Sequence, residues 1–129
     1  MPRLLIDTDV AIDYLRGQDY ARRLLERLWD SGEACLSVVS VYELYAGLRQ
    51  GEEASTEAFI RACRLLPVDD RVARAAAEEY RRWRSEGITL TTADALVAGT
   101  ARVHGLRVAT RNVRHYPDPD LRWDPREVP

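Results

Sequence analysis

The sequence predicts an α/β fold in which helices cover a mainly parallel central sheet of four or five strands. Short apolar runs typical of buried strands alternate with longer segments that repeat apolar residues every three or four positions. Such an alternation indicates helices that cross between parallel strands. The 129 residues have the size of one domain, so we expect a single domain over residues 1–129.

The first half of the chain contains two expected strands and three expected helices. The strands are short and apolar, as RLLI is. Gly17, Gly32 and Gly51 follow the three helical segments, and glycine commonly ends a helix. In chain order, these elements are the strand 3–6, the helices 9–15 and 20–32, the strand 34–38 and the helix 40–51.

The second half continues the alternation and ends in a loop that prolines interrupt. Gly105 closes the last helical segment, and LRVAT after it has the apolar alternation of a strand. The segment YPDPDLRW allows only an edge strand, because proline cannot donate to a sheet. In chain order, these elements are the helix 52–63, the extended run 64–68, the helices 70–87 and 92–105, the strand 106–110 and the edge strand 121–123.

The composition indicates a globular protein and excludes several classes. Hydrophobic residues make up 46% and charged residues 31% of the chain, with a net charge of −2. All 19 basic residues are arginine, which excludes mechanisms that need a lysine amine. The apolar runs are too short to span a bilayer. Cys35 and Cys63 form no paired motif and no signal peptide precedes them, so we expect free thiols in a cytoplasmic protein.

Acidic residues stand where strands end and helices begin. Asp7 directly follows the first strand, and sites in parallel sheets form at the carboxyl ends of strands. Glu43 lies three residues after Ser40, at the expected start of a helix. Asp94 has the same spacing from Thr91, so two capping boxes would explain both acids. Both helices are nearly apolar all round, however, and a buried carboxylate there needs a cationic partner.

The three acids would form a typical Mg²⁺ site if the fold brought them together. Their separations of 36 and 51 residues do not show whether it does. Capping and metal binding therefore both remain open for Glu43 and Asp94 on the residues alone.

The chain resembles a PIN-domain ribonuclease of the VapC toxin type over nearly its whole length. The matching segments are LLIDTDVAIDYL, LSVVSVYELYAGL, TTADALVAGTARVHGLRVATRNVRHY and the terminal LRW. The resemblance implies a PIN-like three-layer α/β/α sandwich in which Asp7, Glu43 and Asp94 are the catalytic, metal-binding acids. Asn112 stands at a fourth position where the family often has Asp, and it supplies an oxygen without a charge.

The resemblance also implies an endoribonuclease that hydrolyses RNA with Mg²⁺ or Mn²⁺. The ion would activate a water for in-line attack on phosphorus, and Glu43 would orient or deprotonate that water. Thr8 either contacts bound water or phosphate or caps a helix, and Asp9 either tunes the site or caps. Thr110 and Arg111, at the end of the last buried strand, are expected to hold a phosphate. Asp13 is expected to face solvent.

A VapC-type toxin has a small DNA-binding antitoxin as its partner, and the resemblance implies such a partner and a homodimer. Five apolar or aromatic residues either line the antitoxin groove or belong to the core, namely Tyr14, Trp29, Tyr42, Tyr45 and Leu48. The arginine-rich segment 71–84 either binds RNA or forms a solvated face with the pairs Arg74–Glu78 and Glu78–Arg82. His104 and His115 have no acidic neighbour in sequence and are expected on the surface or in loops.

Two other functions fit parts of the sequence. IDTDV after an apolar strand resembles the motif of haloacid-dehalogenase-like phosphatases, with Asp7 as nucleophile and Asp9 as general acid. That interpretation gives Asp94 no role. A non-catalytic PIN-like binding module is the other alternative, which Asn112 would favour.

Overall fold

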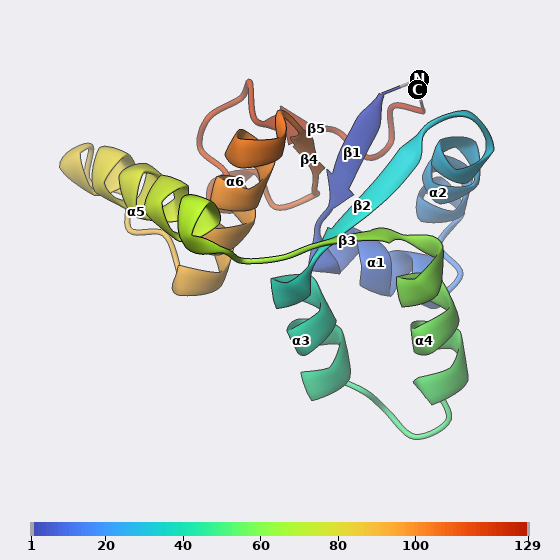
Figure 1. Cartoon of the computed structure of the whole chain (residues 1–129). Helices are drawn as coiled ribbons and strands as arrows, with labels where there is room; N and C mark the ends of the chain where they lie inside the picture. Colours follow the sequence, from blue (N-terminus) through green and yellow to red (C-terminus); the bar gives the residue numbers. More distant parts are fainter. Residues whose placement is uncertain (1, 129) are drawn as a thin grey trace.

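The computed structural model describes residues 2–128 and contains a five-stranded parallel sheet flanked by helices (Figure 1). The strand order is β3-β2-β1-β4-β5, and every pair of neighbours runs parallel. The strands are β1 (Arg3–Ile6), β2 (Glu33–Ser37), β3 (Arg64–Leu66), β4 (Arg107–Ala109) and β5 (Arg122–Trp123). The predicted α/β class and parallel sheet are confirmed.

Six α-helices form two layers around the sheet. α1 to α4 lie on one side, and α5 and α6 lie on the other (Figure 1). Among residues 2–128, no helix combines the length and the apolar character needed to cross a membrane. The helices are α1 (Thr8–Leu15), α2 (Asp19–Ser31), α3 (Val38–Ala46), α4 (Glu53–Ala62), α5 (Asp70–Ser85) and α6 (Thr92–His104), with a short 3₁₀ helix at Val113–His115.

The start of α3 differs from the prediction. Ser37, the last residue of β2, is the N-cap of α3 and accepts a hydrogen bond from the Val39 amide at 3.1 Å. The expected capping box of Ser40 and Glu43 is therefore wrong, because both residues lie inside the helix. Two β-branched residues after Ser37 resemble a strand in sequence and concealed this start. The helix also ends earlier than expected, with Gly47 as its C-cap.

The two layers follow from the alternation of side chains along the strands. Leu4 and Ile6 of β1 point to one face of the sheet and pack against α1, α2, α3 and α4. Leu5 points to the other face, where it packs with Val97 and Ala101 of α6. Because all three strand residues are almost fully buried, β1 is the central strand on which both layers depend.

The chain leaves β1 for β2 on one side and later returns to β4 on the other side. In parallel sheets, ligands bind at such a switch point, outside the carboxyl ends of the strands. The register pairs Ile6 with Ala109, and the Asp7 amide donates to the Ala109 carbonyl at 3.0 Å. Asp7 and Thr110, the next residues on the two strands, are consequently neighbours.

The close packing of α5 on α6 depends on Gly99. A β-carbon at this position would lie 2.7 Å from both the Ala76 nitrogen and the Val72 oxygen. Real β-carbons do not approach main-chain atoms so closely, and main chain of a packed helix cannot move aside cheaply. Gly99 therefore sets the distance between the two helices.

We expect Gly99→Ala to lower the free energy of unfolding by about 1–3 kcal/mol or more, because the added methyl group forces α5 and α6 apart. Urea denaturation followed by circular dichroism measures this loss. Gly47→Ala is the matched control, since the nearest atom to its β-carbon would be the Glu43 carbonyl oxygen at 3.4 Å. Equal effects of the two substitutions would contradict the argument.

Candidate active site

Asp7 lies at the carboxyl end of β1 and is buried, with 6% of its surface exposed. As the N-cap of α1, it accepts a hydrogen bond from the Thr8 amide at Oδ1, at 3.0 Å. The Tyr116 hydroxyl donates to the same oxygen at 3.0 Å, and the Thr110 hydroxyl donates to Oδ2 at 2.7 Å. Three donors from three parts of the chain thus hold one carboxylate in a fixed orientation.

Glu43 on α3 meets Thr8 on α1. The Thr8 hydroxyl donates to Glu43 Oε1 at 2.7 Å, and its oxygen lies 2.9 Å from the hydroxyl of Ser40. Ser40 and Glu43 are three residues apart inside α3, so they share one face of that helix. Thr8 is therefore the first residue of α1 and a partner of Glu43, and the alternative role as a helix cap is wrong.

Asp94 stands in the first turn of α6. The N-cap Thr91 accepts a hydrogen bond from the Asp94 amide at 3.1 Å, which confirms the cap at this helix. The carboxylate Oδ2 lies 3.4 Å from Nδ1 of His115. The sequence did not indicate this pair, because the two residues are distant along the chain and belong to different elements.

Asp9 is bound to the end of β4 through main-chain amides. Its Oδ1 accepts from the Val10 amide at 2.7 Å and its Oδ2 from the Arg111 amide at 3.0 Å. The Arg111 side chain continues to α1 and α2, where Nε lies 2.7 Å from Asp13 Oδ2 and donates to the Tyr20 hydroxyl at 3.0 Å. The expectation of a solvated Asp13 is therefore wrong, since this acid pairs with Arg111.

The acids of the site raise one another's pKa. Burial raises the pKa of Asp7, and the charge of Asp94 adds to this, although the hydrogen bonds that Asp7 accepts oppose it. Burial and the charge of Asp7 raise the pKa of Asp9 to about 6. Burial also raises the pKa of Asp94, with contributions from the charges of Glu43 and Asp9. A divalent cation among these carboxylates would offset their repulsion.

The donor set fits a hydrated hard cation. Among residues 2–128, no three acidic, histidine or cysteine side chains stand close enough to enclose a metal ion directly. Asp7 uses both its oxygens and Glu43 uses one in hydrogen bonds within the chain. Mg²⁺ is usually held by one or two carboxylates and several waters, without an all-protein cage. Carboxylates that lie close enough for their charges to act on one another therefore suit such an ion.

The comparison with protein families decides the identity of the fold. The family model described as the PIN domain matches residues 4–117. The chain belongs to the PIN-domain family. It is 41% identical to ribonuclease VapC19 of Mycobacterium tuberculosis over 119 residues, or 91% of this chain and 95% of that protein.

Further relatives agree with this assignment. Ribonuclease VapC10 of Mycobacterium tuberculosis is 37% identical over 114 residues, which are 88% of this PIN domain chain and 86% of that protein. The DNA-bound VapBC structure from Salmonella typhimurium matches with a TM-score of 0.80 and 25% identity. That match covers 95% of this chain and 96% of the other.

The relatives and the contacts of Asp9 do not favour the alternative functions. A phosphatase of the haloacid-dehalogenase type would need Asp9 as a general acid, whereas both of its oxygens accept hydrogen bonds from main-chain amides. Ribonucleases are the named relatives of this PIN domain, which disfavours a non-catalytic module as well.

Asn112 of the PIN domain is exposed, and only its main chain reaches the site. Its amide donates to the Thr110 hydroxyl oxygen at 3.0 Å. Its side chain makes no hydrogen bond with any residue that the structure describes. The fourth family position thus adds neither a charge nor a held side-chain oxygen here.

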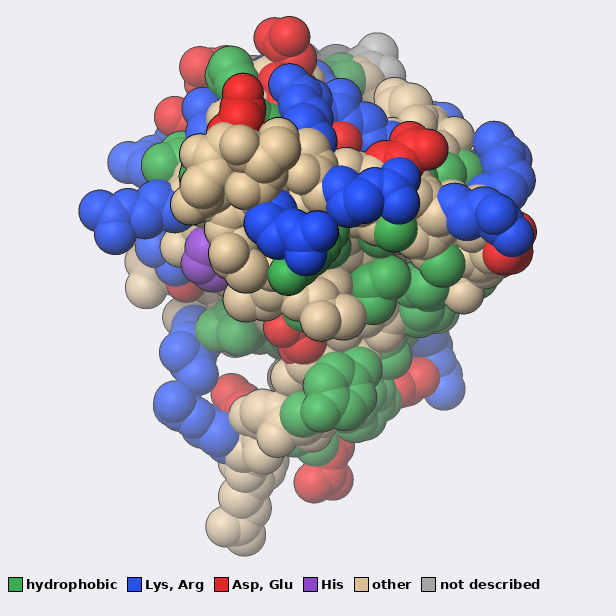
Figure 2. Space-filling model, turned by 90° about the vertical axis from the view of Figure 1, so that its left-hand side faces the viewer, with side chains coloured by type: hydrophobic (Ala, Val, Ile, Leu, Met, Phe, Trp, Pro, Cys, Tyr) green, Lys and Arg blue, Asp and Glu red, His purple; other side chains and the backbone are tan. Residues whose placement is uncertain are grey.

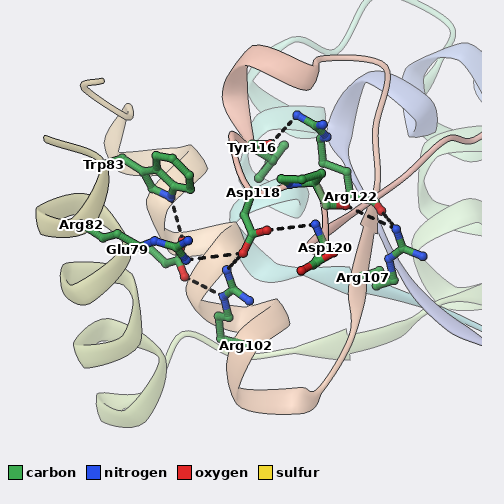
Figure 3. A network of polar contacts seen from close by, with 10 residues as sticks. Glu79, Arg82, Trp83, Arg102, Arg107, Tyr116, Asp118, Asp120 and Arg122 are labelled. Carbon is green, nitrogen blue, oxygen red and sulfur yellow. Dashed lines mark hydrogen bonds and ion pairs between the residues drawn. The ribbon is translucent and has the colours of Figure 1, made fainter. Parts of the chain in front are cut away.

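Tyr116 is a site residue that the sequence analysis missed. The 3₁₀ helix and the loop before β5 carry it, and Arg122 donates to its carbonyl oxygen at 3.0 Å. Two residues later, Asp118 accepts from Arg102 Nη2 at 2.5 Å, and Arg102 Nε donates to Glu79 at 2.6 Å (Figure 3). The loop is thereby joined to α5 and α6. A tyrosine among prolines gives no local signal of this role.

The arginine-rich helix α5 has ion pairs other than those expected. Arg74 pairs with Asp70 at 2.9 Å, and Arg82 lies 3.4 Å from Asp118 and stacks on the Trp83 ring. The predicted pairs with Glu78 are therefore wrong. Figure 2 shows arginines together with acidic side chains on the face that carries α5, a mixture typical of a solvated helix.

The five candidate groove residues lie in three different places. Tyr14 and Trp29 pack edge to face at 5.3 Å and line a pocket of about 410 Å³ with Phe59. Tyr42 and Tyr45 on α3 are exposed, with 72% and 43% of their surface in solvent. Leu48 lines a separate, small pocket beside Glu43. Tyr14 and Trp29 therefore pack with the core, whereas Tyr42 and Tyr45 lie at the surface.

We expect the effect of Asp9→Asn on the free energy of unfolding of the metal-free protein to be more favourable at neutral pH than at acid pH. The pKa of Asp9 is raised from 3.8 to about 6 in the fold, so the folded protein keeps a proton that the unfolded chain releases between these values. The free energy of unfolding therefore falls as the pH rises through this window, and Asn avoids that loss. Because Asp9 is partly exposed, we expect a difference on the order of 1 kcal/mol.

Urea denaturation of the metal-free protein at about pH 4.5 and about pH 7.5 measures this difference. Asp30→Asn removes an exposed acid on α2 and serves as the control. An effect of Asp9→Asn that is the same at both pH values would show that burial does not raise this pKa.

Proposed function

We propose that the protein is a toxin-type endoribonuclease that cleaves RNA by divalent-metal-assisted hydrolysis of phosphodiester bonds. The observation that carries this proposal is that Asp7 and Glu43 both accept hydrogen bonds from Thr8 at the switch point of the sheet, where the charge of Asp94 also raises the pKa of Asp7. Membership of the PIN family and 41% identity to a protein named ribonuclease VapC19 support it. We further infer that the single domain extends past residue 117, since β5 completes the sheet.

Asp7, Asp94 and Glu43 would hold the ion, which we propose to be Mg²⁺ or Mn²⁺. When bound, the ion supplies charge that offsets the negative charge on the phosphate oxygens and lowers the pKa of water. Asn112 brings no charge to the fourth family position, which favours a single tightly held ion over two.

The chain's own residues orient the reacting groups. Thr8 holds Glu43 Oε1, which leaves Oε2 to accept the proton of the attacking water. Thr110 and Tyr116 hold Asp7, so that its carboxylate does not rotate away from the ion. Asp13 and Tyr20 anchor the Arg111 side chain beside Asp9, where its positive charge suits a phosphate of the substrate.

We propose a small DNA-binding antitoxin as the partner that holds the enzyme inactive. The related VapBC from Salmonella typhimurium was solved bound to DNA. The pocket that Tyr14, Trp29 and Phe59 line between α1, α2 and α4 suits an apolar segment of such a partner. The exposed Val38 and Tyr42 on α3 suit the interface of a homodimer. The buried free thiols fit a cytoplasmic protein.

We expect Asp94→Asn to reduce cleavage of a labelled structured RNA by at least roughly 100-fold, because a charged oxygen of the metal site is lost. The assay is run with Mg²⁺, with Mn²⁺ and with a chelator, which should abolish the wild-type activity. Asp70→Asn is the control, since Asp70 also lies in the first turn of a helix but is exposed. Wild-type protein that leaves several RNAs intact, transfer RNAs included, would overturn the proposal.

We expect Tyr116→Phe to weaken Mn²⁺ binding by about 10-fold or more, because the hydroxyl that orients Asp7 is lost. Calorimetric titration with Mn²⁺ measures this change without any substrate. Tyr42→Phe removes an exposed hydroxyl and should bind Mn²⁺ as the wild type does. Unchanged affinity in a folded Tyr116→Phe protein would show that Asp7 does not depend on this hydrogen bond.

A further inference from the structure

A second, basic pocket adjoins the acid cluster at the edge of the sheet. It has a volume of about 240 Å³ and lies where β4 and β5 end. Its walls come from the residues after β4, the loop before β5 and the chain after β5. The lining residues are Thr110, Arg111, Val113, Pro119, Arg122, Trp123, Asp124 and Arg126.

The charge of this pocket is positive. Three arginines line it, and two of them have acidic partners: Arg126 lies 3.5 Å from Asp124, and Arg111 pairs with Asp13 outside the pocket, so one positive charge remains. Among residues 2–128, the Arg122 side chain has only main-chain carbonyl oxygens as partners, at 3.1 Å from Val113 and 3.0 Å from Tyr116. Those bonds fix the guanidinium without neutralising it. Arg107 stacks on the ring of Trp123, so a further cation lies next to this lining residue.

The pocket is connected to the acid cluster through two consecutive residues. Thr110 lines the pocket and donates its hydroxyl proton to Asp7. Arg111 lines it as well, and its amide donates to Asp9. Figure 3 shows Arg122 and Arg107 on one side of Asp118, away from Arg82 and Arg102 on the other. Arg122 lines the pocket, whereas Arg107 begins β4 and is not one of the lining residues.

We propose that this pocket binds a backbone phosphate of the RNA strand next to the bond that is cleaved. The inference rests on the proposed ribonuclease function and adds a binding subsite to it. Arginine forks suit phosphate oxygens, and pre-fixed guanidinium groups lose little conformational freedom on binding. The positive charge of the subsite attracts the RNA strand to the site, where the acidic residues alone would repel it.

The test measures binding of a short fluorescent single-stranded RNA by anisotropy in the non-cleaving Asp94→Asn background, without metal and at several salt concentrations. Arg126→Gln should raise Kd several-fold and reduce the slope of log Kd against log salt by about 0.7, the value for one phosphate contact on a single strand. Arg126→Lys should keep the salt slope. Arg126 is the residue to change, since Arg122 also holds the loop main chain.

Arg61→Gln is the matched control, because Arg61 on α4 is equally exposed and also forms one surface ion pair, with Glu57. It should leave both Kd and the salt slope unchanged. Equal effects of Arg126→Gln and Arg61→Gln on Kd and on the salt slope, together with RNA cleavage by the protein that keeps Asp94, would overturn the subsite and leave the enzyme function intact. Wild-type protein that neither binds nor cleaves RNA would overturn both.

An acidic peptide such as oligoglutamate provides one more comparison. If Arg126→Gln weakens binding of this peptide and leaves the RNA affinity unchanged, the pocket serves a protein partner and the RNA inference is wrong. In the active protein, the expected loss appears in KM with kcat unchanged, because the subsite lies beside the reacting atoms and not among them.

Discussion

The burial of the Asp7 carboxylate at the end of the central strand is the constraint on which the rest of the site depends. An unpaired charge there would be costly, so each hydrogen bond to it has structural consequences. The Thr8 amide requires α1 to begin at once after β1. The Thr110 hydroxyl requires β4 as the neighbour of β1. The Tyr116 hydroxyl requires the loop before β5 to fold back over the sheet.

That last requirement explains the polar network around Asp118. The loop places Tyr116 and Leu121 in the apolar core, and charged side chains also join it to the helical layer. Arg102 bridges Glu79 and Asp118, while Trp83 donates to Glu79 at 3.2 Å. Arg102 lowers the pKa of Asp118, so this pairing stabilises the fold above acid pH and is lost as the pH falls. The helix pair that Gly99 brings together thus also supports Tyr116.

Acidic and basic side chains occupy separate regions at the carboxyl end of the sheet. Acids gather at the switch point, where they raise one another's pKa and reduce stability at neutral pH. Arginines gather beside them near β4 and β5, where carbonyl groups hold Arg107 and Arg122 without neutralising them. The proposed function needs both regions, because the site would bind a cation and a polyanion. Residues 110 and 111 lie between the two and contact each.

The sequence by itself determined the class of fold and the place of the site. Alternating apolar strands and amphipathic helices allow little except a parallel sheet between helical layers, and an acid directly after a buried strand marks its carboxyl end. The likeness to VapC-type toxins joined Glu43 and Asp94 to Asp7 in one site, which no local pattern could do. These predictions depend on short-range periodicity or on motifs, and both can be recognised in a single sequence.

Only the tertiary structure decided which side chains touch. Tyr116 and Asp7 are 109 residues apart in the chain, yet their side chains form a hydrogen bond. Arg111 and Asp13 form an ion pair although they belong to elements that the sequence does not place side by side. The start of α3 was also decided there, since Ser37 both ends a strand and caps a helix. Hydrogen bonds between distant segments depend on register and on close helix packing. Neither leaves a periodic trace in a single sequence.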